Sequence, residues 1–573
     1  MKKCFYFFIA SIFVVLSSLI YPQDPTQGII DVNNITSWIS NDGGHPPIYL
    51  SEGETYNGSF PKGTAGFVYT EGIVWGGKVY DGSSSIIRVC GNTYTYGTSP
   101  LTRLYRVRPD YDVADLKDDA SNYYGCSIDS VSESMTELLH NQYKKDWNEW
   151  PADKGAPFYD YNSDGIYDPE IDIPGVPGAS QTIWISYDDS KSTWIYGAPP
   201  IGVKVFETYW TYPDSNLSNT IYRNVKLIYS GLNASAQNSH IDSMYFCLFS
   251  DPDVGSAGDD YTGCDTALNL GYAYNSQNIE EQYLAYNLSP PAVGYSYLHG
   301  AAKRTGNPAD SAIVNFAWQH GYKYFNDKPM TVFIPKRTAD GNSDPGFNYT
   351  GTFQFYNIMR GYNSYPPYPD ARLFETNVWG EYIGGYGTYL LAGDPVTGTG
   401  WIDGQTEGPG ARRMFLMTGP FNIELGDTVE TTLALVGGIG YNNIASITNL
   451  KYFTRYSIIG YNSYINSYTI GSFKFEKPDT TSHNIIPENF QLTQNYPNPF
   501  NPETTIDYSV PQTSHVTIKI YDMLGRLVAT LVDSDKAIGN YSIKWKPAGA
   551  AGIYIFTMKA GNYIKARKMA YVK

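Results

Sequence analysis

Apolar and polar residues alternate along much of the segment Thr220-Ile-Tyr-Arg-Asn-Val-Lys-Leu-Ile-Tyr229. The segments Gly202-Val-Lys-Val-Phe-Glu-Thr-Tyr-Trp210 and Ser243-Met-Tyr-Phe-Cys-Leu-Phe249 show the same pattern, and residues 428–437 resemble a further strand. A period of two is typical of a strand that buries one face. Long polar loops separate these strands. We therefore expect a mainly β fold whose body is a β-sandwich with one or two helices, not a barrel of tight hairpins.

The composition supports this fold class. The chain has 573 residues, enough for several domains, and 42% of them are hydrophobic. Only 17% are charged, whereas 53 are tyrosine, a residue that favours strands and combines an apolar ring with a polar tip. The sequence thus favours strands and loops over helices.

Two segments outside the main strands predict helices. Met135, Leu138, Leu139, Tyr143 and Trp147 are spaced to lie on one helical face within residues 131–149. Ser132 or Ser134 is suited to cap the start of this helix, and Pro151 stops it. Residues 443–463 have a similar spacing and predict a second helix. Asp81-Gly82, between two short apolar runs, predicts a hairpin turn.

The N-terminus has the pattern of a targeting segment. Met1-Lys2-Lys3 is basic, and an apolar run of 17 residues, Cys4 to Ile20, follows it. This run is short for a membrane span, so we expect residues 1–23 to be a removed signal peptide, the alternative being an uncleaved anchor. No later run predicts a transmembrane helix.

An even number of cysteines follows this segment: Cys90, Cys126, Cys247 and Cys264. In an exported chain, disulfides are permitted. The most local pairing is Cys90–Cys126 with Cys247–Cys264, although free buried thiols are the alternative. The spacing fits no zinc site.

One acidic segment has the spacing of a calcium-binding loop. It is Asp160-Tyr-Asn-Ser-Asp-Gly-Ile-Tyr-Asp-Pro-Glu-Ile-Asp172, with oxygen ligands at alternate positions and a glycine for the turn. The predicted ligands are Asp160, Asn162, Asp164, the carbonyl of Ile166, Asp168 and Asp172. Ile171 occupies the position of the bidentate glutamate, and no helix pattern precedes the loop. A free-standing calcium loop and a solvated acidic turn are the two interpretations.

A second acidic cluster lies within residues 251–265, directly after the alternating segment 243–249. Its carboxylates repel one another unless a cation or solvent screens them. The candidate calcium ligands are Asp251, Asp253, Asp259 and Asp260, and Asp265 lies close by in the sequence. Asx-turns in a surface loop are the alternative, as is an acid–base pair of a glycosidase.

The last 80 residues contain six short alternating segments punctuated by glycine and proline. Such spacing predicts a small Greek-key sandwich. The segment opens with Asn495-Tyr-Pro-Asn-Pro-Phe-Asn-Pro502, and Gly525 is placed for a tight turn. Its distinctive residues are Pro497, Asn498, Pro499, Tyr521, Asp522, Gly525, Gly552, Tyr554, Lys565, Arg567 and Lys568.

These features resemble the type A C-terminal sorting domain of the type IX secretion system, found in Bacteroidota-type secreted proteins. The resemblance implies an immunoglobulin-like (Ig-like) β-sandwich close to that of flagellar hook-capping proteins. It also implies export through the periplasm to the outside or to the outer-membrane surface, with the secretion machinery as partner. The expected organisation is a signal peptide (1–23), an N-terminal β-rich region ending in a helix (24–150), a body (151–475), a linker (476–494) and the sorting domain (495–573).

The body also resembles a group of large secreted proteins that bear the same domain. The similarity is carried by residues 251–275, by Gly393-Asp-Pro-Val-Thr-Gly-Thr-Gly-Trp401 and by residues 419–427. No activity follows from this resemblance, because the group is uncharacterised.

The charge distribution restricts the function of the body. Residues 484–573 contain ten Lys/Arg and six Asp/Glu, which is a net charge of +4. Because the whole chain has a net charge of −16, the remaining residues carry −20. Such acidity argues against binding nucleic acid. The chain contains neither His-Glu-x-x-His nor Gly-x-Ser-x-Gly, so we assign no catalytic residue.

We therefore expect a structural or adhesive protein, non-catalytic and stabilised by calcium. A secreted hydrolase of polysaccharides and a glycan-binding protein that uses exposed tyrosines are the alternatives. Surface glycans and self-association remain open as partners.

Overall fold

The computed structural model describes most of the chain. The described residues are 26–45, 48–49, 55–190, 195–232, 238–337, 345–362, 364, 388–405, 408–467, 490–493, 495, 498, 500–523, 525–537, 539–547, 551–561 and 563–572. The expected signal peptide and most of the expected linker lie outside these residues, as do Pro497 and Pro499.

One layer of the body is an antiparallel sheet of five strands in the order β23-β24-β16-β7-β8. Its strands are β7 (Thr70–Tyr80), β8 (Ile87–Gly91), β16 (His240–Asp251), β23 (Val332–Arg337) and β24 (Arg412–Glu424). The predicted hairpin turn joins β7 to β8, where the Arg88 guanidinium donates to Asp81 across the turn at 2.7 Å.

The other layer is an antiparallel sheet of ten strands with the main order β10-β13-β14-β15-β25-β19-β18-β17. Two short strands, β9 and β22, pair with β13 and β19 beside this path. The bounds are β9 (Ser99–Pro100), β10 (Tyr105–Val107), β13 (Gln181–Asp188), β14 (Val203–Thr211), β15 (Thr220–Tyr229), β17 (Asp260–Asp265), β18 (Leu270–Asn275), β19 (Ala292–Arg304), β22 (Tyr322–Tyr324) and β25 (Thr428–Gly438). Strands from both sides of residue 150 thus share the two sheets.

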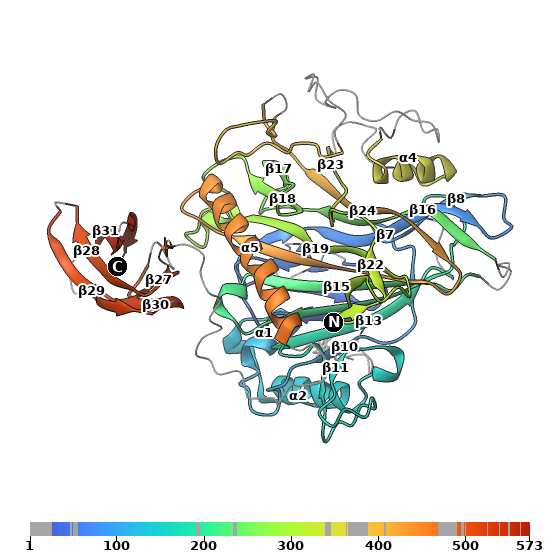
Figure 1. Ribbon diagram of the computed structural model, residues 1–573, viewed down its shortest axis with the longest axis horizontal. Coiled ribbons are helices and arrows are strands. Elements are labelled where there is room, and N and C mark those ends of the chain that lie inside the picture. The colour runs from blue at the N-terminus through green and yellow to red at the C-terminus, as the bar shows by residue number, and fades with distance from the viewer. Residues whose placement is uncertain are drawn as a thin grey trace, which may run out of the picture.

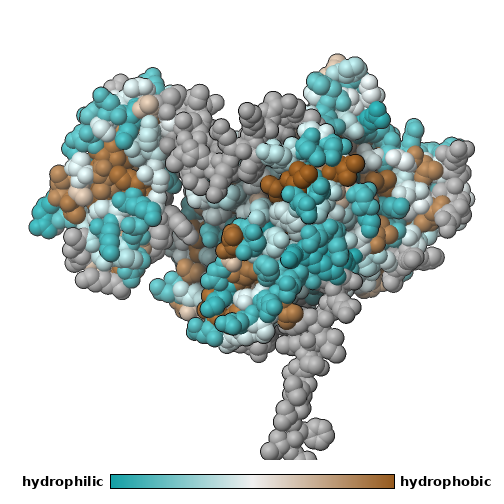
Figure 2. All heavy atoms as spheres, turned by 90° about the horizontal axis from the view of Figure 1, so that it is seen from below, coloured by the Kyte–Doolittle hydropathy of each residue, from teal (hydrophilic) through white to brown (hydrophobic). Residues whose placement is uncertain are grey.

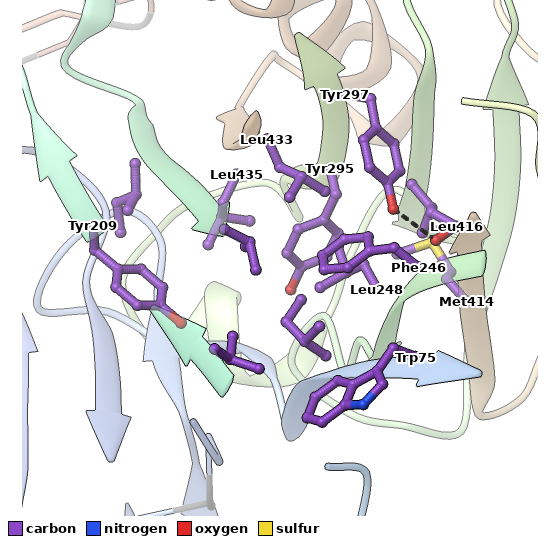
Figure 3. Close-up of a cluster of buried hydrophobic side chains, with 14 of the residues drawn as sticks. Trp75, Tyr209, Phe246, Leu248, Tyr295, Tyr297, Met414, Leu416, Leu433 and Leu435 are labelled. Atoms are coloured by element: carbon purple, nitrogen blue, oxygen red, sulfur yellow. Dashed lines mark hydrogen bonds between the residues drawn. The ribbon is translucent and has the colours of Figure 1, made fainter. Parts of the chain in front are cut away.

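The main core lies between these sheets, as expected for a sandwich. On β15, Ile221, Val225 and Leu227 face inward because alternate residues of a strand share a face. Trp75 and Phe246 reach the same core from the five-stranded sheet (Figure 3). The Tyr297 hydroxyl donates to the carbonyl of Leu416 at 3.0 Å and so links the two layers.

Helix α5 (Asn443–Ser467) covers the outer face of the ten-stranded sheet (Figure 1). It confirms the helix predicted over residues 443–463. Leu450 and Tyr461 pack in the same cluster as Tyr222 on the sheet. The approach is close at Gly438, where a Cβ atom would lie 2.1 Å from the backbone nitrogen of Leu450.

Helix α4 (Tyr349–Met359) covers the outer face of the five-stranded sheet, so the body has four layers. Phe355, Ile358 and Met359 pack against Phe249 and Phe415 of the strands. This helix was not predicted.

The helix predicted over residues 131–149 is confirmed as α2 (Glu133–Asn148). Ser132 caps it, because its hydroxyl accepts from the Met135 amide at 3.3 Å. Leu139 and Tyr143 are buried against α1 (Lys117–Tyr124), whereas Leu138 is 54% exposed.

Smaller elements complete the body. They are β1 (Gln27–Ile30), β2 (Ser37–Ser40), β3 (Ile48–Tyr49), β4 (Thr55–Tyr56), β5 (Gly58–Ser59), β6 (Gly66–Val68), β11 (Phe158–Tyr159), β12 (Ile173–Pro174), β20 (Ser311–Val314), β21 (Ala317–His320), α3 (Glu281–Leu284) and three short 3₁₀ turns (Ile128–Ser130, Ala152–Lys154 and Ser215–Leu217).

The C-terminal segment forms a separate small sandwich of two antiparallel sheets. One sheet has three strands in the order β26-β27-β30, and the other has four in the order β29-β28-β31-β32. Val516, Ile518 and Phe556 lie in the core of this sandwich. The strands are β26 (Gln491–Leu492), β27 (Thr504–Val510), β28 (Ser514–Asp522), β29 (Leu527–Lys536), β30 (Gly539–Trp545), β31 (Gly552–Ala560) and β32 (Tyr563–Tyr571).

Candidate metal sites and the sorting domain

The first acidic loop extends from the short β11–β12 pair and is largely exposed. Its side chains turn toward its own backbone. The Gly165 amide donates to Asp160 Oδ2 at 2.7 Å, and the Ile166 amide donates to Asp164 Oδ1 at 2.8 Å. Gly165 has a φ of 76°, which a glycine adopts readily. The turn predicted from the sequence is therefore present.

Asp172 closes this loop from the buried side. It is 2% exposed and accepts from the Tyr161 amide at 2.9 Å and the Asp168 amide at 2.8 Å. The Asp168 carboxylate accepts from the Glu170 amide in turn. Asp172 is thus buried at the base of the loop, whereas Ile166 is exposed.

The second acidic cluster is divided by partners distant in sequence. Asp251 accepts from the Tyr94 hydroxyl at 2.6 Å, and Tyr94 in turn accepts from Arg413. Asp265 pairs with Lys451 of α5 at 3.1 Å. These two carboxylates are therefore committed to other contacts.

Asp253, Asp259 and Asp260 each bury a carboxylate oxygen, Oδ1, that has no hydrogen-bond partner. The other oxygen of Asp260 accepts from the Val254 amide at 3.1 Å. Burial and then the charge of Asp251 raise the pKa of Asp253 to about 8. Complete burial also raises the pKa of Asp260 well above its usual value. Each shift means that the ionised carboxylate is disfavoured where it lies, since burial and neighbouring carboxylates oppose its charge.

Neither acidic region is a preformed metal cage. Across the residues that the structure describes, no group of three or more His, Cys, Asp or Glu side chains is arranged to hold an ion. Calcium therefore stays a prediction.

The sandwich core contains a charged network that the sequence analysis missed. The Arg223 guanidinium donates to Glu207 and, at 3.1 Å, to Glu71 of the opposite sheet. Tyr209 donates to Glu207 at 2.7 Å, and Tyr295 donates to Glu71; both rings extend into this core (Figure 3). A cavity of about 20 Å³ lies beside these groups. It is roughly the size of one water molecule, so no substrate fits there.

Of the two interpretations of the cysteines, the structure has the free thiols: Cys90, Cys126, Cys247 and Cys264 are unpaired with one another. Cys247 faces the helix α4 side of the five-stranded sheet, whereas Cys264 faces the core between the sheets. Cys90 points into that core beside the carbonyl of Pro199, at 3.9 Å. Cys126 follows α1, outside the sandwich core. The predicted partners therefore belong to different layers.

In the C-terminal sandwich, the motif residues have structural roles. Tyr521 and Asp522 end β28, and Asp522 accepts from the Arg526 amide at 3.0 Å across a turn in which Gly525 has a φ of 77°. Gly552 begins β31, and Tyr554 packs edge-on against Trp545 with ring centroids 5.1 Å apart.

The last strand, β32, is basic and is attached to the start of this sandwich. Arg567 donates to the carbonyl of Leu492 at 2.8 Å, while Asn498 accepts from the Ala570 amide at 2.7 Å. Lys565 and Lys568 are exposed. The strand thus presents lysines to solvent while its other contacts reach Leu492 and Asn498.

Fold and motifs together define a β-rich body that carries a C-terminal targeting sandwich. Residues 494–572 match the family of the secretion system C-terminal sorting domain. The chain is therefore a protein sorted by the type IX secretion system, and its destination is the outside of the cell or the outer-membrane surface. No helix in the described part of the chain is long and apolar enough to cross a membrane.

Other comparisons add little about the body. No curated protein matches the sequence. Among solved structures, the chain is similar to the polysaccharide lyase BACCELL_00875 at 6% identity with a TM-score of 0.17. That match covers 68% of this chain and 39% of the lyase. A TM-score this low supports no argument about fold or activity.

Proposed function

We propose that the body is a structural or adhesive element of the cell surface, without catalytic activity and stabilised by calcium, and that the sorting sandwich is Ig-like. The main support is where the convergent charged groups lie. The side chains of Glu71, Glu207 and Arg223 are only 4%, 0% and 6% exposed, inside a closed core. A polymer cannot reach groups enclosed in this way, so they favour a rigid scaffold over an enzyme.

The surface is consistent with this proposal. The face seen in Figure 2 is mainly hydrophilic, with small separated hydrophobic patches. The exposed loop between Asp160 and Asp172 extends from the β11–β12 pair and offers oxygen donors of the kind that calcium prefers. Exposed acidic loops on a rigid sandwich suit a displayed protein that meets calcium outside the cell.

Deleting the gene tests the surface role. We expect the deletion strain to attach less well to surfaces and to glycan-coated beads than the parent, and a complemented strain to recover. The purified full chain should release no sugar ends or unsaturated products from a panel of polysaccharides. Undiminished attachment, or polysaccharide cleavage by the purified chain, would contradict the proposal.

Thermal unfolding tests the calcium component. If calcium binds the folded chain, adding it should raise the melting temperature of the purified protein, and a chelator should lower it. Equal melting temperatures in calcium and chelator would contradict stabilisation by calcium.

A further inference from the structure

Several unpartnered polar atoms lie close together where β16 connects to β17. Asp253, Asp259 and Asp260 lie in the β16–β17 connection, and each buries an Oδ1 atom that has no partner. Asn275 lies directly opposite Asp260 in the β17–β18 register and is fully buried, yet its Nδ2 also has no partner. Ser276 adds a buried hydroxyl without a partner. Buried polar groups are normally satisfied, so a cluster of orphans indicates a missing polar occupant.

These residues share one location. The Ser276 amide donates to the carbonyl of Asp259 at 2.8 Å, which places the end of β18 beside the connection. The Val254 amide donates to Asp260, so the connection folds back on the first residue of β17. The orphan atoms thus surround the corner where the chain passes from the five-stranded sheet to the ten-stranded sheet.

The charge of the corner indicates the kind of occupant. Among the nearby basic side chains, Lys451 pairs with Asp265 and Asp394, and Arg413 donates to Tyr94. The charge of Arg413 lowers the pKa of Asp253, but by less than burial and Asp251 raise it. The carboxylate of Glu280 accepts from the amides of Ser256 and Tyr283 and adds a further negative charge. Water could satisfy the hydrogen bonds but would leave the negative charges buried and uncompensated. A cation does both.

The donor atoms further restrict the cation. The candidate ligands are oxygens of Asp253, Asp259, Asp260 and Ser276, and the local set includes neither histidine nor cysteine. A hard cation with a flexible coordination shell, such as calcium, prefers such a set. Because the carboxylates are not yet gathered into a cage, binding has to draw them together. Gly255 and Gly258 lie in the connection, and at Gly258 the nearest atom to a built Cβ is 3.8 Å away.

We propose that a calcium ion binds this corner through Asp253, Asp259 and Asp260 and fastens β17, an edge of the ten-stranded sheet, to β16 of the five-stranded sheet. The inference rests on the calcium component of the proposed function and assigns it to one site. The proposed ligands leave out Asp251, which accepts from Tyr94 through its other carboxylate oxygen, and Asp265, which pairs with Lys451.

Calcium titration of the purified full chain tests the assignment. The double variant Asp253→Asn/Asp260→Asn removes two of the negative charges, whereas Asp160→Asn/Asp164→Asn is a matched control in the other acidic loop. We expect calcium to raise the melting temperature of the wild type and of the control by on the order of 4 °C near saturation. The Asp253/Asp260 variant should lose this response and, in chelator, melt above the wild type, because charge repulsion is relieved.

Isothermal titration gives a second measurement. The Asp253/Asp260 variant should bind one calcium ion fewer than the wild type, and the milder variant Ser276→Ala should weaken the same site in case the double variant does not fold. An Asp253/Asp260 variant with the full calcium response would overturn the assignment. If only the control variant loses the response, this inference fails while stabilisation by calcium stands. If the wild type itself does not respond, both fail, and the surface role is tested separately by attachment.

Discussion

Arg223 on β15 and Glu71 on β7 form an ion pair across the apolar core, with Nη1 of Arg223 3.1 Å from Oε1 of Glu71. Arg223 also contacts Glu207 on the neighbouring strand of its own sheet. One guanidinium therefore contacts two carboxylates and joins the two layers of the sandwich. Removing it leaves both carboxylates buried without their cation.

Substituting Arg223→Met should destabilise the body by about 3–5 kcal/mol, because a broken buried ion pair leaves unpaired charge in an apolar core. Urea unfolding of the purified chain measures this change. Lys204→Met on β14 is the control, since Lys204 is exposed, and it should unfold within about 0.5 kcal/mol of the wild type. An Arg223→Met protein as stable as the control would show that the ion pair does not hold the layers together.

His299 should make stability depend on pH. Its Nε2 lies 3.1 Å from the Tyr461 hydroxyl, and its Nδ1 lies 3.1 Å from the carbonyl of Gly300. Burial lowers the pKa of His299 to about 4 from 6.5. Above pH 6.5 the imidazole is neutral in both the folded and the unfolded chain, so its titration does not change the free energy of unfolding. As the pH falls toward 4, only the unfolded chain gains the proton, so stability drops by about 3 kcal/mol.

Unfolding measured at several pH values for His299→Gln and the wild type checks this assignment. The variant should show a shallower loss of stability between pH 6.5 and 4. Parallel curves for the two proteins would mean that His299 titrates normally in the folded chain.

The contact between Gly438 and α5 predicts a steric effect. Gly438→Ala would place a Cβ atom 2.1 Å from the backbone of Leu450, so the helix has to move away from the sheet. Overpacking of this kind costs about 1–3 kcal/mol. In Gly346→Ala, the added methyl would have no atom closer than 3.6 Å, so this variant serves as the control. Equal melting temperatures for the two variants would contradict the close packing of α5.

The strands with alternating apolar and polar residues were predictable, because alternate residues of a strand share a face and the sandwich buries one face of each sheet. In β15, Ile221, Val225 and Leu227 face the core, and Arg223 lies in phase with them. The sequence therefore contained the signal for a buried arginine. Its partners were not predictable, because Glu71 is brought to Arg223 only by the packing of two sheets.

Helix α4 shows where local propensity fails. Its sequence, Tyr349-Thr-Gly-Thr-Phe-Gln-Phe-Tyr-Asn-Ile-Met359, is rich in residues that favour strands. Burial of Phe355, Ile358 and Met359 against the sheet outweighs that preference. Asn348 caps the start, since its side chain accepts from the Gly351 amide at 3.3 Å. By contrast, α2 was predictable because its cap and its apolar spacing agree.

The ligands of the second acidic cluster also could not be predicted from sequence spacing alone. Sequence proximity grouped Asp251 and Asp265 with Asp253, Asp259 and Asp260. The fold gives the first two distant partners, since Tyr94 and Lys451 reach them from 157 and 186 residues away along the chain. Which carboxylates remain uncompensated is therefore a property of the tertiary structure.

Export is the central claim, and cell fractionation tests it most directly. The full chain and a chain truncated after residue 493 are produced in a host that has the type IX machinery, with Lys204→Met as a full-length control. We predict that the two full-length chains reach the medium or the cell surface and that the truncated chain accumulates in the periplasm. A truncated chain found outside the cell in the same amount as the full chain would contradict the role of residues 494–572.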